Sequence, residues 1–576
     1  MRITYNDKLN KLLNPYLESL LKEKSSLEPE TLTLFDLFME DLDMGGRYGI
    51  FSEILEPRLE EIIREENIES IANLMDGRLN TLFRYMLGDE FAGLFHTYLQ
   101  LEARCPHTIG YDRRAQRSAN PSNHLDHARD AWLQFLKLRA TGFSVEAILK
   151  GGNTPEDTEE FSGYMNSSYW LAAQIAQGNE KVIEYLNQVL TSENNVHRLQ
   201  RWYLHAIAIS GHRPLLELEG KLLLAAKLQE GLRQAIVETM DEGCPESYLY
   251  LFSIIYNNGL QRFASVKRSI AVCTGIGEQD SSERITNKYV ELIWNFLNHP
   301  ETARNTLQSK DTVELYLALW SIGFYDTDEI RAIVPDIIRK GAKHQIQTLL
   351  YFLRCTQSSQ MNHLISKDAF EVWHDDPKVV AAILPLYMDG LYLSRYSDNK
   401  EAPTLSDYFE TPEEAVRHYG YLKQVYQSIS AKEVYSPYVF PWDCVVLTRS
   451  DVVLKMAYIA WMTNDIRLRE ELCTYLPALE SYNRASYIGI VLARTESKVE
   501  QEYVLQSLGD RSADIRDEAY KVLSEMSLSP EQYQHIEELL RFKYSEMRIN
   551  AINLLMKQPE AQLAASIRRL LSDKNA

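Results

Sequence analysis

Residues 508–519 read Leu508-Gly-Asp-Arg-Ser-Ala-Asp-Ile-Arg-Asp-Glu-Ala519, and residues 540–551 read Leu540-Arg-Phe-Lys-Tyr-Ser-Glu-Met-Arg-Ile-Asn-Ala551. The two stretches match at an offset of 32 residues, which also separates Arg516 from Arg548 and Leu523 from Leu555. A third copy opens at Leu571, and the sequence ends at Ala576. A repeat of this length predicts a solenoid in which pairs of helices stack on their neighbours. Because the third copy is unfinished, we expect the natural protein to continue beyond it.

The helices expected around residues 499–508 and 514–526 are apolar on one side only. The second of them carries its apolar residues at helical spacing, at Ile515, Ala519, Val522, Leu523 and Met526. Neither helix can bury such a stripe alone, so each pair must pack against the pairs before and after it. The apolar residues of the last helix, Leu563, Ile567 and Leu570, then lack a following neighbour, and we expect a frayed or artificially paired C-terminus.

Composition favours an all-α protein of the cytosol. The chain has 576 residues, a formal charge of −20, and few Gly and Pro, which fall mostly between helical stretches. Its six cysteines are scattered without a CxxC pair, which is typical of reduced thiols in the cytoplasm. No apolar run approaches the length of about 20 residues that spans a membrane. The negative charge disfavours nucleic acid as a partner.

Changes in composition divide the chain into four expected regions. Residues 1–150 form an N-terminal helical region, and the loop-rich stretch after Gly151 opens irregular helical pairs over 151–395. Within them, Asn257-Asn-Gly259 is expected to separate two helices. A polar linker at 396–406 opens a further helical region over 396–480, and the regular repeats occupy 481–576.

The repeat resembles the HEAT family. Leu508, Asp510, Ile515, Arg516 and Ala519 match the leucine, aspartate, valine, arginine and alanine of that family in order. The resemblance implies an armadillo-like, extended α-solenoid of antiparallel helix pairs, irregular at the N-terminus and HEAT-like at the C-terminus. It also implies that the aspartate and arginine form a polar ladder along the stack, here at Asp510, Arg516, Arg548 and Asp573. Phe542 stands where the second copy should carry its aspartate, so the ladder is expected to change at that step.

The whole chain is also similar to the N-terminal part of a large bacterial family of HEAT-containing proteins of unknown function. Three segments carry this resemblance, namely Arg262-Phe-Ala-Ser-Val-Lys-Arg268, Thr274-Gly-Ile276 and Leu317-Ala-Leu-Trp320. Because the function of that family is unknown, this similarity implies no activity for the chain.

A cluster of basic residues stands out against the acidic chain. It comprises Arg104, Arg113, Arg114, Arg117 and Arg129. Arginines on a loop before a helix can hold a phosphate or carboxylate, so anion binding is one interpretation. A loop that pairs with the acidic body of the protein is the alternative, and it is favoured.

Histidines offer two further candidate sites, each with a simpler explanation. His124 and His127 lie three residues apart, as two ligands on one helix face would, but a metal site needs further ligands. We therefore expect no metal and no other cofactor. The run Trp373-His-Asp-Asp-Pro377 places an imidazole beside two carboxylates, yet an acidic residue before proline is typical of a helix start.

These patterns favour a non-enzymatic scaffold or recognition arm that binds a protein or peptide partner, or the C-terminal remainder of the same polypeptide. Tyrosines are frequent in the middle region, for example Tyr248, Tyr316, Tyr387, Tyr392 and Tyr396. Tyrosine is enriched in binding surfaces but is equally common as a half-buried helix residue, and the sequence does not separate the two. The alternative is a module that binds nucleic acid or an anion through the cluster at 104–129, such as one that processes DNA. No membrane association is expected.

Overall fold

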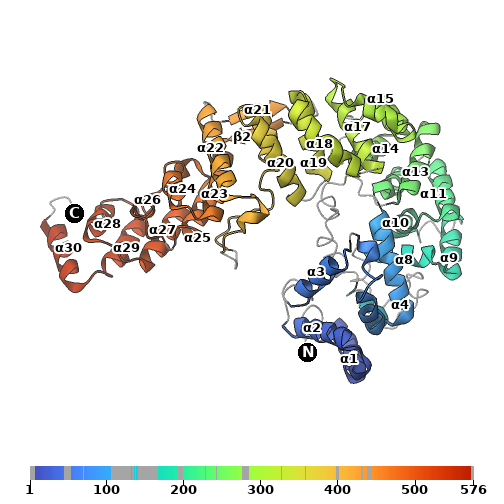
Figure 1. The fold of residues 1–576 in the computed structure, drawn as a ribbon, viewed down its shortest axis with the longest axis horizontal. Helices are drawn as coiled ribbons and strands as arrows, with labels where there is room; N and C mark the ends of the chain where they lie inside the picture. Colours follow the sequence, from blue (N-terminus) through green and yellow to red (C-terminus); the bar gives the residue numbers. More distant parts are fainter. Residues whose placement is uncertain are drawn as a thin grey trace. The chain divides into compact units, whose positions relative to one another are not determined.

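The computed structural model describes most of the chain, apart from residues 1–6, 45–53, 69, 106–131, 133–134, 137, 141–165, 192–198, 227–228, 242, 275–284, 326, 357–358, 397–400, 430–432, 438–443, 494 and 573–576. The described residues fold almost entirely into helices (Figure 1). None of the helices in this part is both long and apolar enough to cross a bilayer.

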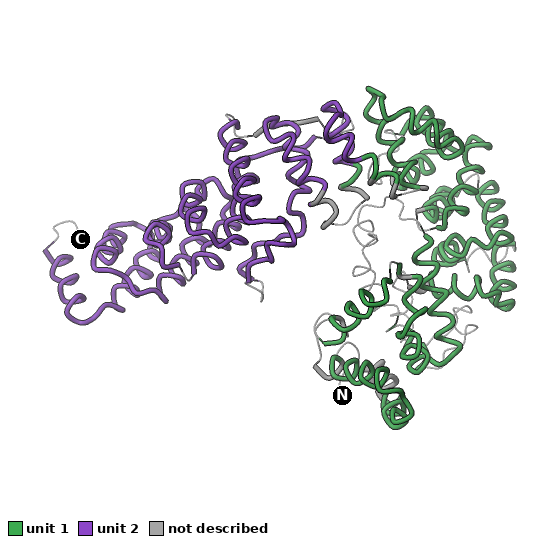
Figure 2. Tube along the Cα trace, viewed as in Figure 1, with its two compact units in different colours: residues 1–333, 352–358 green, residues 334–351, 359–576 purple. Residues whose placement is uncertain are grey.

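The chain divides into two compact units (Figure 2). Unit 1 comprises residues 1–333 and 352–358, and unit 2 comprises residues 334–351 and 359–576. This division falls near residue 340, away from the boundaries at 150, 395 and 480 that composition suggested. Those four regions remain predictions.

Unit 1 and its boundary with unit 2 contain these helices: α1 (Asp7–Glu23), α2 (Pro29–Met44), α3 (Leu55–Glu65), α4 (Leu79–Arg104), α8 (Asn166–Ala176), α9 (Glu180–Thr191), α10 (Arg201–Ser210), α11 (Arg213–Ala225), α12 (Glu230–Glu238), α13 (Pro245–Asn257), α14 (Ala264–Cys273), α15 (Asn287–Asn298), α16 (Pro300–Thr306), α17 (Thr312–Tyr325), α18 (Thr327–Lys340) and α19 (Lys343–Thr356). The expected break at Asn257-Asn-Gly259 is confirmed, because α13 ends there and Gly259 adopts φ 60°. Only glycine enters this left-handed region at little cost.

Unit 2 continues with α20 (Ser359–Trp373), α21 (Pro377–Ile383), α22 (Pro412–Ser428), β1 (Glu433–Pro437), β2 (Cys444–Thr448), α23 (Arg449–Thr463), α24 (Ile466–Leu472), α25 (Ser481–Ile490), α26 (Lys498–Ser507), α27 (Ala513–Glu525), α28 (Pro530–Leu539), α29 (Ser545–Leu555) and α30 (Glu560–Ser572). The strands form an antiparallel ribbon in which Tyr435 pairs with Val446. This short ribbon was not predicted from the sequence, and the described chain is otherwise helical, as expected.

The last helices of unit 2 pack on helices two elements away. In one row, seen in Figure 1, α25 packs on α27 and α27 on α29; in the other, α26 packs on α28 and α28 on α30. The predicted helices at 499–508 and 514–526 are confirmed to within one residue by α26 and α27. Each helix buries its apolar stripe in this stack, for example Ile515, Ala519 and Leu523 of α27. In the last helix, Ile567 is exposed and Leu563 and Leu570 are half-buried.

His363 fixes the start of unit 2 by joining α20 to two loops. Its Nδ1 accepts a hydrogen bond from the Met388 amide at 2.8 Å, so its Nε2 carries the proton and donates to the Tyr408 carbonyl at 2.9 Å. Met388 has φ 51°, a strained value for a residue with a side chain. Burial lowers the pKa of His363 to about 4 despite the bond to Tyr408. The neutral ring therefore holds a strained backbone in place.

We expect acid to weaken unit 2 through His363 in the window between pH 6.5 and pH 4.5. In this window a histidine of the unfolded chain binds a proton, whereas the buried ring stays neutral. The free energy of unfolding therefore decreases by up to about 1.4 kcal/mol for each unit by which the pH is lowered. The carboxyl groups titrate mostly below this window. Denaturant unfolding of the whole chain followed by circular dichroism at several pH values measures the slope.

The variant His363→Gln is the matched control, because its amide can accept from Met388 and donate to Tyr408 without titrating. It should show a shallower loss of stability over the same window. Equal slopes for wild type and variant would contradict the assignment.

Candidate functional site

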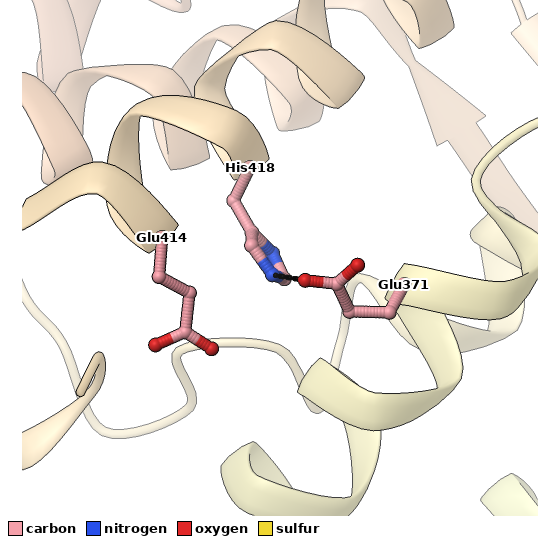
Figure 3. A group of neighbouring side chains, drawn as sticks. All are labelled: Glu371, Glu414 and His418. Carbon is pink, nitrogen blue, oxygen red and sulfur yellow. Dashed lines mark hydrogen bonds and ion pairs between the residues drawn. The ribbon is translucent and has the colours of Figure 1, made fainter. Parts of the chain in front are cut away.

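Two carboxylates and a histidine meet between α20 and α22, and Figure 3 shows them. Glu371 comes from α20, and Glu414 and His418 come from successive turns of α22. One oxygen or nitrogen of each lies within 4.8 Å of the others. Because these are the atoms that zinc prefers, the group is the strongest candidate for a metal site in the described part of the chain.

His418 is fully buried and bonded through both ring nitrogens. Its Nε2 lies 3.0 Å from Glu371 Oε1, and its Nδ1 lies 2.8 Å from the Tyr387 hydroxyl. In the neutral ring Nε2 donates to the carboxylate, and Nδ1 accepts from the tyrosine. Burial lowers the pKa of His418, and the charge of Glu371 offsets this only in part. At neutral pH, the ring is therefore uncharged.

Each carboxylate of the group already has a cation. Arg417 donates to Glu371 Oε1 at 2.7 Å, and Lys367 lies 3.0 Å from Glu414. Burial raises the pKa of both carboxyl groups, but their hydrogen bonds and neighbouring cations outweigh it, so both pKa values lie below the ordinary one. Tyr421 adds a hydrogen bond to Glu371 Oε2 at 3.3 Å.

The charges around Glu371, Glu414 and His418 indicate whether the group binds a metal ion or serves a structural role. Two carboxylates face one lysine and one arginine, so the group is electrically balanced without a metal ion, and a divalent ion would have to displace Lys367 or Arg417. The histidine has no exposed surface from which to exchange protons with a substrate. We therefore interpret the group as a polar network that joins α20 to α22. Glu371 precedes Glu414 by 43 residues in the sequence, so this network was not identified from the sequence.

The predicted anion site lies mostly outside the described residues. Arg113, Arg114, Arg117 and Arg129 belong to that part of the chain, as do the candidate metal ligands His124 and His127. Arg104, at the end of α4, forms an exposed ion pair with Glu246 at 3.0 Å. The one described member of the cluster thus pairs with the acidic body of the protein.

The four residues predicted for the polar ladder differ from one another in their contacts and exposure. The Asp510 carboxylate binds Arg484 at 2.8 Å, and the Asp510 carbonyl accepts from Arg516. Arg516 also reaches Glu546 of the next copy at 3.1 Å, because Phe542 offers no carboxylate there. Arg548 is exposed, and Asp573 lies outside the described residues. Two further ion pairs between neighbouring helical pairs join Arg469 to Glu500 and Arg569 to Glu537.

The helix-start interpretation of the Trp373–Pro377 run is confirmed. Asp376 caps α21 by accepting from the amides of Lys378 and Val379, and Lys343 lies 2.7 Å from its carboxylate. His374 instead stacks on Tyr421, with ring centroids 3.8 Å apart.

The structure separates the buried tyrosines from the exposed ones. Tyr248, Tyr316 and Tyr387 are fully buried, whereas Tyr392 and Tyr396 are 66% and 73% exposed. Tyr392 lies beside Tyr482 of α25, with 3.3 Å between the hydroxyl oxygens. We call Tyr392, Tyr396 and Tyr482 the tyrosine surface. Sequence reasoning missed Tyr482, since it lies some 90 residues from its neighbours in the chain.

Arg395 fixes the tyrosine surface to the helices. Its side chain is only 10% exposed and forms ion pairs with Asp514 and Glu518 of α27. The guanidinium lies 4.9 Å from the centroid of the Tyr396 ring, and the Arg395 amide donates to Ser486 of α25. The segment that carries Tyr392 and Tyr396 is therefore tied to two helices.

We expect Glu371→Leu to destabilise the chain by about 2 kcal/mol, because it leaves the buried His418 N–H without its acceptor. Zn²⁺ and EDTA should each leave the melting temperature of the wild type unchanged, as the network is balanced without a metal. Calorimetry of both proteins measures this. A zinc-dependent rise in the wild type that Glu371→Leu abolishes would establish a metal site instead.

Neither the curated proteins nor the solved structures include a match to this chain. A family model covers residues 34–576, which is nearly the whole sequence. The chain therefore belongs to this family, a family of unknown function designated DUF5724.

Proposed function

We propose that this chain is a non-enzymatic scaffold that binds a protein partner and is built as a HEAT-type solenoid of antiparallel helix pairs. The solenoid proposal is supported by the two rows of helices from α24 to α30 and by the offset of 32 residues between α27 and α29. In such a stack, the core faces serve stability and leave the open faces free for recognition.

The tyrosine surface is the observation that carries the proposal. Tyrosine provides a large contact area and loses little entropy on binding, and it is enriched among the residues that dominate interfaces. Here Tyr392 and Tyr482 contact each other and Tyr396 stacks with Arg395, so much of their freedom is lost before any partner binds. Side chains ordered in advance cost less when a complex forms.

The anion-binding alternative has less support. Arg104 is paired with Glu246, and the chain carries a formal charge of −20. A polyanion would on average be repelled by such a protein.

An affinity capture from the source cells tests the proposal. We expect the wild-type chain to recover a stoichiometric protein partner, and the variant Tyr392→Ser/Tyr396→Ser/Tyr482→Ser to recover at least about tenfold less of it. Quantitative mass spectrometry measures both recoveries.

The matched control is Val499→Ser, which removes another exposed apolar side chain of unit 2, on α26. It should recover as much partner as the wild type. Equal recovery by all three proteins would contradict the proposal, and recovery of nucleic acid in place of protein would favour the alternative at residues 104–129.

A further inference from the structure

The open face of α29 carries an apolar stripe that its fold does not require. Ile549, Ile552 and Met556 are 55%, 49% and 63% exposed. Their spacing of three and four residues places them on one side of the helix. The other side is occupied by buried residues, namely Met547, Ala551, Leu554 and Leu555. The stripe is therefore additional to the core of unit 2.

The preceding copy of the repeat provides an internal comparison. At an offset of 32 residues, the buried residues of α29 correspond to Ile515, Ala519, Val522 and Leu523 of α27, which are also buried. The stripe corresponds to Asp517, Tyr520 and Ser524. The two helices thus share a core face, while the open face changes from polar to apolar.

The α27 residues that correspond to the stripe show how exposed these positions are within the stack. Helix α27 has neighbours on both sides, α25 and α29, and yet Asp517 stays exposed and Tyr520 and Ser524 stay partly exposed. The position of Ile549 is therefore open even where a helix has neighbours on both sides in the stack. Ile552 and Met556 continue the same side of α29 and are more exposed than their partly buried counterparts, Tyr520 and Ser524.

Charge changes together with the apolar stripe. Residues 541–557 contain four basic residues and one acidic residue, Glu546, which is paired with Arg516. Residues 509–525 of the preceding copy contain three basic and five acidic residues. In the described part of the chain, neither Lys543 nor Arg548 forms an ion pair. An acidic protein therefore carries a locally basic surface at this helix.

Two aromatic side chains are exposed in the turn before α29. Phe542 and Tyr544 lie in the turn before the helix and are 47% and 68% exposed. We call Phe542, Tyr544, Ile549, Ile552 and Met556, with Lys543 and Arg548, the α29 surface. Large apolar side chains that gather beside unpaired cations mark an interaction site more often than the scattered ones of an ordinary surface.

We infer that the α29 surface binds an amphipathic helix of a partner protein whose polar edges are acidic. A stripe with this spacing is the counterpart of one apolar stripe on a second helix, which would lie along α29. Lys543 and Arg548 would attract carboxylates at the edges of that helix and so set its orientation. This inference rests on the proposed function as a protein-binding scaffold, and it names a surface separate from the three tyrosines.

Binding of two designed helices to the whole chain tests the inference. Both are synthetic amphipathic peptides with the same leucine stripe, and one has glutamate at its polar edges where the other has lysine. Fluorescence anisotropy at low salt should show the glutamate peptide binding at micromolar concentration, and the lysine peptide binding at least about tenfold more weakly.

The matched variant, Ile549→Asp/Ile552→Tyr/Met556→Ser, replaces the three stripe residues of α29 by the residues at the equivalent positions of α27. Since α27 carries these side chains at the equivalent helical positions, the variant should fold, which circular dichroism checks. It should bind the glutamate peptide at least about tenfold more weakly than the wild type. A second variant, Lys543→Glu/Arg548→Glu, should reverse the preference between the two peptides.

Several results would overturn the inference. The inference is wrong if the wild type and the matched variant bind the glutamate peptide equally, if neither protein binds it, or if the wild type binds both peptides equally. Sedimentation could show self-association of the wild type that the matched variant abolishes, which would assign the surface to a second copy of the chain. Stripe-dependent binding to phosphatidylserine vesicles would assign it to a membrane. The peptide assay is independent of the tyrosine variant, so failure here leaves the capture experiment unaffected.

Discussion

The short, one-sided helices of unit 2 are stable only in a stack, and the rest of this unit depends on that constraint. The helices from α25 to α30 have 10 to 13 residues, and an isolated helix of this length is marginal in water. Each must therefore bury its apolar stripe against neighbours. The stack leaves one face of each helix exposed, and that face is free to carry other residues.

Ion pairs connect neighbouring helical pairs of unit 2. The clearest example joins Arg469 to Glu500, whose carboxylate has no exposed surface. Removing one partner of such a pair leaves a buried charge and is costly, whereas the intact pair adds little to stability. These contacts therefore favour one arrangement of the stack over others. Where Phe542 replaces the expected aspartate, Arg516 binds Glu546 instead, so the coupling persists with a different acceptor.

Sequence reasoning worked best where local signals agree. The ends of α26 and α27 could be predicted to within one residue because their apolar residues recur at helical spacing. Asp376 before Pro377 predicted the start of α21 because an acidic residue before proline is a local signal for a helix start. These features depend on neighbouring residues, which a single sequence displays directly.

Features that depend on distant residues could not be predicted. His418 resembles any histidine on a helix until Glu371 and Tyr387 are placed beside it. Tyr387 and Tyr392 are similar in sequence context, yet one is buried and the other exposed. The β1–β2 ribbon was missed because its strands are stabilised by each other.

The division between core face and open face explains why the repeat of this chain does not by itself reveal a function. The core positions of α27 and α29 keep the same chemistry, because the stack tolerates only apolar residues there. The open positions change from Asp517, Tyr520 and Ser524 to Ile549, Ile552 and Met556 without a change of fold. The repeat therefore identifies the core positions that the copies share, and the recognition that we propose uses the positions that they do not share. A comparison of the copies within one chain can reveal those positions, and it requires only the register that the core residues provide.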